Sequence, residues 1–223
     1  DYRRYLTDYV HLLNDDWEYS HYDRVYDLPE KIVMSHNDAQ KISLPFIFDS
    51  KSTGNDRIPP PYADVHQSVT LLSRRCSLPH YWSTLRKKIT FAGMSCAFHI
   101  FVNGRLVGYS DIRHVPISFD ITSAWHEGEN EVILVLYSSS ASDHLRSGWD
   151  KQFRGIVSDI YIEAFPAISL TDLDYSSEPL NSEHTSWSVN VTAELSSSRI
   201  SLESPVVRLD LYDDYKLLSS NEF

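Results

Sequence analysis

The chain has 223 residues, of which 42% are hydrophobic and 13% aromatic, and its formal net charge at pH 7 is −11. This length allows one large domain, or one domain and part of a second, with a packed core. The acidic balance argues against a nucleic-acid partner and against an anionic membrane surface, because both require a basic face. No apolar run approaches the roughly 18 residues that a membrane span needs.

The first five residues, Asp1 to Tyr5, lack the apolar core of a signal peptide and contain no initiator methionine. We therefore expect a processed or excised piece of a longer protein, with a cytoplasmic location. Cys76 and Cys96 are the only cysteines, too few for a disulfide framework. Two buried thiols are the expected state.

The first strands are predicted near the N-terminus. Asn14-Asp15 is typical of a turn, and Trp17-Glu18-Tyr19 alternates as a strand does. Pro45 suits the end of a strand, where proline removes no central hydrogen bond. Residues 49–68, rich in Ser, Asp, Asn and Pro, then predict a surface loop long enough to be functional.

The clearest local signal is a hairpin after two further strands predicted within residues 68–90. Residues 97–102 form an apolar run rich in aromatic and β-branched side chains, and Asn103-Gly104 follows at once. Asn-Gly between two such runs favours a type I′ turn, which needs positive φ at both central positions. His99 lies inside this run, where a core or interface histidine is a better interpretation than a metal ligand.

Residues 117–121 alternate, residues 125–130 predict a turn, and residues 131–137 predict a strand buried on both faces. Regular short strands without a long helical period indicate an all-β sandwich. Residues 138–154 depart from this rhythm. After Pro166, three more alternating strands are predicted, as follows: 168–175, 187–195 and 206–212.

Four segments carry a resemblance to a known family. They are Ala97-Phe98-His99 with Asn103-Gly104-Arg105 and Gly108-Tyr109-Ser110, then Phe119-Asp120-Ile121-Thr122, then Gly128-Glu129-Asn130, and finally Arg154 to Ile162. In this order and spacing they resemble the N-terminal jelly-roll domain of glycoside hydrolase family 2, most of all its bacterial β-galactosidases. The resemblance covers roughly residues 10 to 165.

The resemblance implies a jelly-roll, sugar-binding-type β-sandwich over residues 1–166. It also implies a truncated start of an immunoglobulin-like sandwich over residues 167–223, because such a domain needs about seven strands in about 100 residues. Residues 41–46 resemble a strand of the family that ends in a proline, so the resemblance predicts one strand there. The family has a glycine where this chain has Asp15. We expect Asp15 to adopt the left-handed conformation there, which Asp tolerates.

The resemblance also implies sugar-binding residues in two loops. In the β-galactosidases, the loop matching residues 138–154 supplies an aspartate to a sugar hydroxyl and a sodium ion. Asp150 is the best match, with Asp143 second, and Trp149 could stack on a sugar face. Asn55 is the nearest match for an asparagine of the earlier loop. The structural alternatives are solvated loop carboxylates, a polar loop tip and a packed tryptophan.

Catalytic chemistry is not expected within this chain. Family 2 enzymes hydrolyse with two glutamates on a (β/α)₈ barrel, and the sequence shows no βα alternation. We therefore assign no catalytic residue, and no cofactor to this piece, although sodium or magnesium is possible in the full enzyme. The ten histidines show no metal-ligand spacing.

The resulting hypothesis is the non-catalytic N-terminal part of a β-galactosidase-like enzyme. Its expected partners are a β-glycoside, expected to be a galactoside, the catalytic barrel of the same chain and other copies in a homo-oligomer. A free-standing carbohydrate-binding module and a purely structural domain remain the alternatives, because a fold does not determine a function. β-Glucuronidase and β-mannosidase also remain open within the family.

Overall fold

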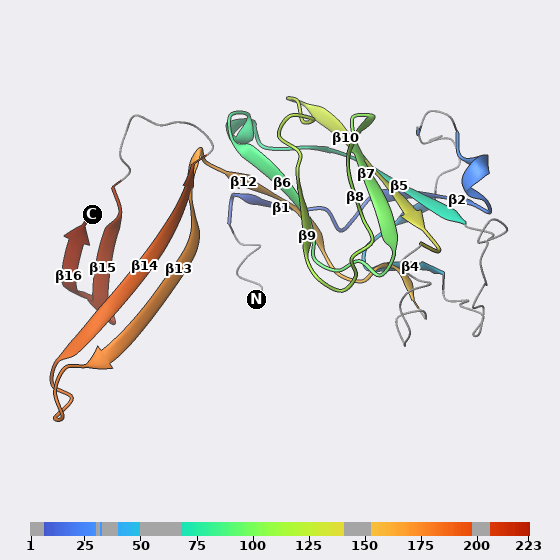
Figure 1. Ribbon diagram of the computed structural model, residues 1–223. Helices are drawn as coiled ribbons and strands as arrows, with labels where there is room; N and C mark the ends of the chain where they lie inside the picture. Colours follow the sequence, from blue (N-terminus) through green and yellow to red (C-terminus); the bar gives the residue numbers. More distant parts are fainter. Residues whose placement is uncertain (1–6, 30–31, 33–39, 50–67, 141–152, 198–205) are drawn as a thin grey trace. The chain divides into compact units, whose positions relative to one another are not determined.

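The computed structural model describes residues 7–29, 32, 40–49, 68–140, 153–197 and 206–223, and almost all of its regular structure is strand (Figure 1). The chain divides into two compact units, Asp1–Ala164 and Phe165–Phe223. The predicted all-β class is confirmed. The helical segments that the described ranges contain are two single 3₁₀ turns, η2 (Val25–Asp27) and η4 (His80–Trp82).

The described residues of the first unit form twelve strands. They are β1 (Val10–Leu12), β2 (Trp17–Tyr22), β3 (Gln40–Ile42), β4 (Phe46–Asp49), β5 (Val69–Ser77), β6 (Arg86–Phe91), β7 (Ala97–Val102), β8 (Arg105–Ser110), β9 (Ile117–Asp120), β10 (Glu129–Tyr137), β11 (Arg154–Ile156) and β12 (Ile160–Phe165). A six-stranded sheet has the order β3-β2-β5-β10-β7-β8, and a four-stranded sheet the order β1-β12-β6-β9. Strands β4 and β11 form a separate antiparallel pair.

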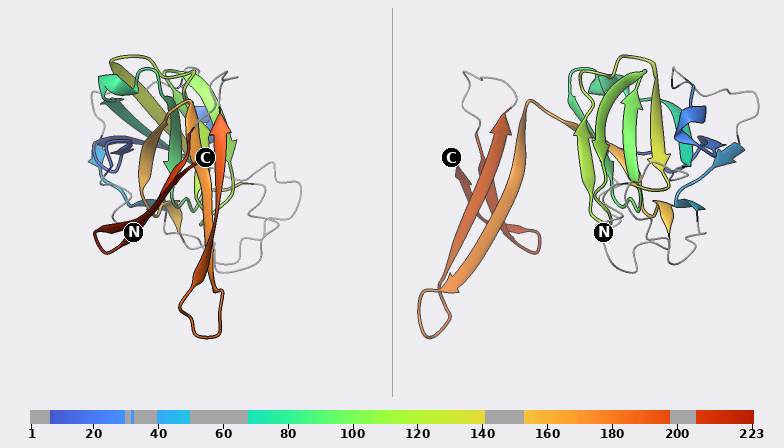
Figure 2. Two further views of the ribbon diagram at one scale, coloured as in Figure 1. Left: turned by 90° about the vertical axis from the view of Figure 1, so that its left-hand side faces the viewer. Right: turned by 45° about the vertical axis from the view of Figure 1, so that its right-hand side comes forward.

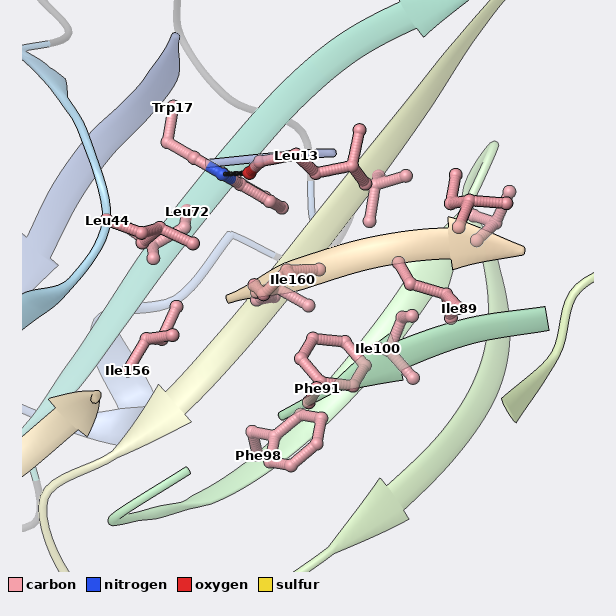
Figure 3. Close-up of a cluster of buried hydrophobic side chains, with 14 of the residues drawn as sticks. Leu13, Trp17, Leu44, Leu72, Ile89, Phe91, Phe98, Ile100, Ile156 and Ile160 are labelled. Atoms are coloured by element: carbon pink, nitrogen blue, oxygen red, sulfur yellow. Dashed lines mark hydrogen bonds between the residues drawn. The ribbon is translucent and has the colours of Figure 1, made fainter. Parts of the chain in front are cut away.

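One hydrophobic core lies between the two larger sheets (Figure 3). Ile89 and Phe91 of β6 meet Phe98 and Ile100 of β7 there, and the rings of Phe91 and Phe98 are 4.7 Å apart. Because side chains of a strand alternate between its faces, every second residue of β6, β7, β10 and β12 enters this core. The sandwich architecture follows from that alternation.

Trp17 fixes the entry of the chain into this core. Its side chain is fully buried, and its indole Nε1 donates a hydrogen bond of 2.5 Å to the Leu13 carbonyl oxygen (Figure 3). A buried indole N–H needs such an acceptor.

The six-stranded sheet also carries apolar side chains on its other face. Val69, Leu71 and Val135 form a second, smaller cluster, packed against Tyr22 and Val25 among others. With a cluster on each face of the sheet, residues Val132 to Leu136 of β10 are all buried. The prediction of a strand buried on both faces is confirmed.

The predicted hairpin is present as β7 and β8. Asn103 has φ 51° and Gly104 has φ 76°, as a type I′ turn requires. The Asn103 amide Nδ2 donates to the Ala124 carbonyl and to Asn130 Oδ1, and its Oδ1 accepts from the Glu131 N–H at 2.9 Å. Two of the family-like segments therefore meet at one turn.

Two local expectations were wrong. The left-handed residue of the first turn is Asp16, with φ 59°, and not Asp15. The strand predicted over residues 41–46 is two strands, β3 and β4, separated at Ser43 to Pro45. Proline removes a ladder hydrogen bond, so the chain leaves one sheet there and joins β11 instead.

In the second unit, residues 165–197 and 206–223 are described, and they form two antiparallel hairpins. They are β13 (Ile168–Pro179) with β14 (Trp187–Ser197), and β15 (Arg208–Asp213) with β16 (Lys216–Glu222). Figure 2 shows β13–β14 as a long twisted ribbon, drawn in orange. Strand β16 was missing from the prediction. Val189 and Val191, two residues apart on β14, share one face of that strand and line a groove of about 290 Å³ within this unit.

Candidate functional site

The four residues predicted to contact sugar lie outside the part of the chain that the structure describes. Asp143, Trp149 and Asp150 belong to segment 141–152, and Asn55 belongs to segment 50–67. The proposed sodium ligand, Asp150, is among them. The structure does describe residues close to the ends of both segments, here called the loop roots: Asp49 and Ser68 for segment 50–67, and Ser138 and Arg154 for segment 141–152.

One pair of loop roots is held by strand pairing. Asp49 is the last residue of β4 and Arg154 the first of β11, and the two face each other in the antiparallel register. The next pair is Gly155 with Ile47, after a register irregularity at Arg154. Asp49, which precedes segment 50–67, thus lies beside Arg154, which follows segment 141–152 in the sequence.

Gly155 makes this close approach possible. Its φ is 153°, and a Cβ at this position would overlap the backbone of Phe46 and Ile47. Its carbonyl oxygen accepts hydrogen bonds from the Ser95 N–H at 2.9 Å and the Ser95 hydroxyl at 3.1 Å. Only glycine combines this conformation with this contact.

The second pair of loop roots is held by hydrogen bonds. The Ser138 N–H donates to the Ser68 carbonyl at 3.1 Å, and the Ser68 N–H donates to the Ser138 hydroxyl at 3.0 Å. Arg154, only 7% exposed, donates from Nε to the Ser138 carbonyl at 2.8 Å and so connects the two pairs. The four loop roots therefore lie at one place in the fold.

An aromatic group lies beside these roots. Tyr137 immediately precedes Ser138, and its hydroxyl shares a hydrogen bond of 2.9 Å with Nδ1 of His99. The His99 ring lies 4.7 Å from the ring of Tyr109, which is 48% exposed. Burial lowers the pKa of His99 and raises that of Tyr137, so both groups are neutral at neutral pH.

The interpretation of His99 as a packed histidine rather than a metal ligand fits this contact. Among the described residues, no group of three or more His, Cys, Asp or Glu side chains could hold a metal ion. Cys76 and Cys96 are free thiols, and Cys96 is buried. None of the helical segments in the described ranges is long and apolar enough to cross a membrane.

The loop roots and the aromatic group had no signal in the sequence. The Arg154-Gly155-Ile156 string indicates the end of the domain, but it does not reveal that Arg154 reaches Ser138. The contact between Arg154 and Ser138, which are 16 residues apart, depends on how the chain between them folds. No local pattern records that path.

A family model matches residues 10–166, and its description is "Glycosyl hydrolases family 2, sugar binding domain". This chain belongs to that family. The match includes all four loop roots, and the family-like segments of the sequence lie inside it.

The curated relatives include β-galactosidases. The enzyme of Clostridium acetobutylicum is 31% identical over 143 residues, which are 58% of this chain and 16% of that protein. The enzyme of Priestia megaterium is 29% identical over 142 residues, 63% of this chain and 14% of that protein. The β-galactosidase of Oenococcus oeni is 23% identical over 213 residues, 90% of this chain and 20% of its own length. The chain thus spans a fifth or less of these relatives.

Solved structures share the fold. A β-glucuronidase of Ruminococcus gnavus in complex with D-glucuronic acid has a TM-score of 0.67 at 14% identity, covering 97% of this chain and 38% of that one. A Bacteroides uniformis β-glucuronidase has a TM-score of 0.67 at 17% identity, covering 96% and 25%. At these identities the likeness establishes the fold alone.

Proposed function

We propose that this chain is the non-catalytic N-terminal part of a β-galactosidase-like family 2 glycoside hydrolase. Its segments 50–67 and 141–152 form one rim of the sugar site in the complete enzyme. The observation that carries this proposal is the common origin of the two segments, fixed by the Asp49–Arg154 strand pair and the Ser68–Ser138 hydrogen bonds. Two loops that start together can act on one ligand.

In this role, the chain and the catalytic barrel have different tasks. The catalytic glutamates belong to a barrel outside residues 1–223, so this chain by itself does not hydrolyse glycosides. Residues 1–166 support that barrel and take part in subunit contacts. Residues 167–223, with their two hairpins, form the start of an immunoglobulin-like sandwich.

The candidate sugar contacts keep the roles that the family resemblance implies. Asp150 accepts a hydrogen bond from a sugar hydroxyl and contributes to a sodium site, and Trp149 offers its ring to the C–H face of a pyranose. Asp143 and Asn55 are additional polar contacts. In the sequence, Asp150 precedes the buried Arg154 by four residues.

A galactoside is the favoured sugar. The relatives named above with 29% and 31% identity are β-galactosidases. The β-glucuronidases resemble this chain at 14% and 17% identity, which supports a shared scaffold rather than a shared substrate. Sugar choice depends on loop and barrel residues, which a scaffold does not determine.

A chimeric enzyme tests the proposal. Residues 10–166 replace the matching region of the Clostridium acetobutylicum β-galactosidase, and assembly is checked by size-exclusion chromatography. We expect the chimera to hydrolyse an aryl β-galactoside. Asp150→Ala should lower its kcat/KM by about tenfold or more, because a charged hydrogen bond to substrate is lost. Asp23→Ala is the matched control, with a side chain 96% exposed, and should change kcat/KM by less than about twofold.

Two results would contradict the proposal. The first is turnover of an aryl β-galactoside by residues 1–223 alone. The second is an assembled, active chimera in which Asp150→Ala and Asp23→Ala have the same effect.

A free-standing carbohydrate-binding module is the second candidate. It is favoured by the exposed Tyr109 ring beside His99 and Tyr137, since an aromatic ring can stack on a sugar. Titration of the chain with galactose, glucuronate, mannose and a β-linked oligosaccharide, followed by amide NMR shifts, separates the two. Saturable shifts at Tyr109 or Trp149 support the module, whereas no binding supports loops that act only beside the barrel.

A further inference from the structure

Arg74 occupies an unusual position in the first unit. It lies on β5 between Leu72, a fully buried core residue, and Cys76, which packs against the same core. Side chains two residues apart share a face of the strand, so Arg74 points toward the space between the two sheets. The next residue, Arg75, is exposed and faces the other way.

Two donors of the Arg74 guanidinium are buried without a partner. Its Nε and Nη1 atoms are shielded from solvent, and neither forms a hydrogen bond in the structure. Burying a charged donor without an acceptor is costly, and most buried polar groups have a partner for this reason. The unpaired Nε and Nη1 donors of Arg74 therefore indicate that a hydrogen-bond acceptor binds beside this side chain.

No neighbouring group in the described part of the chain accepts a hydrogen bond from Nε or Nη1 of Arg74. His11 of β1 is half-buried; burial lowers its pKa, and the charge of Arg74 lowers it further. Burial raises the pKa of the Cys76 thiol to about 11, so the thiol carries no charge. The carboxylate of Glu129 acts on Cys76, but no ion pair between it and Arg74 is found among the described residues.

The site is separate from the loop roots. Ser68 precedes β5, and Arg74 lies six residues further along, a distance of about 20 Å at about 3.3 Å per residue. Glu129 at the start of β10 pairs with Ser77, at the end of β5 opposite to the loop roots. The sugar-rim function proposed above makes no use of this end.

We propose that Arg74 and His11 form a binding site for an oxyanion: a carboxylate, sulfate or phosphate group. A guanidinium offers parallel N–H donors that match two oxygens of such a group. The imidazole of His11 adds a third donor from the facing sheet. Binding an anion there satisfies the orphaned donors and balances the charge that disfavours protonation of His11.

The experiment compares three versions of the 223-residue chain: unmodified, Arg74→Met and Arg75→Met. Both variants remove one positive charge and keep an apolar stem, but only Arg74→Met removes the inward guanidinium. Thermal unfolding is followed by circular dichroism while sodium chloride is replaced by sodium sulfate at constant ionic strength. Because sulfate stabilises most proteins by exclusion, the informative quantity is the difference between variants.

We expect a saturable sulfate-dependent rise in Tm for the unmodified chain and Arg75→Met, at least about 2–4 °C greater than for Arg74→Met. The ring resonances of His11, identified by their loss in His11→Gln, should shift along the same saturation curve. This NMR measurement needs no Arg74 variant, so it decides the proposal even where Arg74→Met does not fold.

Equal sulfate effects on all three chains, or His11 resonances that do not respond to sulfate, would overturn the proposal. A further series identifies the source of the anion. Saturation by sulfate or acetate at constant protein concentration supports a small free anion. A stabilisation that depends on Arg74 and rises with protein concentration without added sulfate supports a carboxylate from a second copy.

Discussion

Replacement of Gly155 by alanine tests the account of the loop roots. The backbone at Gly155 has φ 153°, which L side chains rarely adopt, and this strain costs about 1–3 kcal/mol. The added Cβ would also overlap the carbonyl oxygen of Phe46 and the Cα of Ile47. Both are backbone atoms of β4, so no side-chain rotation relieves the overlap and the β4–β11 pair must separate.

Gly104→Ala is the matched control. Gly104 also has a positive φ, 76°, but a Cβ added there would meet nothing within 4 Å, so its replacement carries strain alone, about 1–2 kcal/mol. We expect Gly155→Ala to destabilise the chain by about 3 kcal/mol or more. In thermal unfolding followed by circular dichroism, its Tm should be at least about 3 °C below that of Gly104→Ala.

Amide hydrogen exchange locates the effect. Exchange should accelerate at Ile156 and along β4 in Gly155→Ala, while the β7–β8 hairpin remains protected. Equal melting temperatures for the two alanine variants would refute the argument, since they would mean that the close approach of Gly155 to β4 contributes nothing to stability.

Three further predictions concern single side chains. Asn103→Ala removes the side-chain hydrogen bonds that join the hairpin turn to Ala124, Asn130 and Glu131. We expect the free energy of unfolding, measured in urea, to fall by about 2–3 kcal/mol, and a fall below about 0.5 kcal/mol would contradict this role. Burial raises the pKa of Cys76 to about 11, so roughly one thiol in a thousand is ionised at pH 8, and neither Cys76 nor the buried Cys96 should react with Ellman's reagent before unfolding. Burial lowers the pKa of His99 below 6.5 in the folded state, so the unfolded chain binds its proton first as pH falls. Stability should therefore decrease below about pH 6.5, and His99→Gln should weaken that decrease in denaturant titrations at about pH 5 and 7.

The parts of the fold that could be predicted are those whose cause is local. The type I′ hairpin follows from Asn103-Gly104, because few other residue pairs tolerate positive φ at adjacent positions. The doubly buried strand β10 follows from its unbroken apolar run. Each inference needs only neighbouring residues and a steric or hydrophobic rule.

The errors occurred where local rules allow two answers. Asp15 and Asp16 can both adopt the left-handed conformation, and the choice of Asp16 depends on how the turn joins Asn14, whose side chain donates to Asp159 at 2.7 Å. Strand β16 was missed because its pattern, Lys216 to Glu222, contains only two apolar residues, and every position of it is exposed. Pairing with β15 rather than burial makes it a strand.

Packing explains why the family-like segments contain the residues they do. It does not explain which sugar the enzyme binds. Asn103 bonds to Asn130, and Gly108 lies so close to the Phe119 ring that a Cβ would overlap it. Enzymes that act on different sugars can therefore share these packing positions. Asp150 lies outside the described residues, and its proposed role rests on the family resemblance together with the position of the loop roots. The sugar must therefore be tested at the loops that leave Arg154 and Ser138.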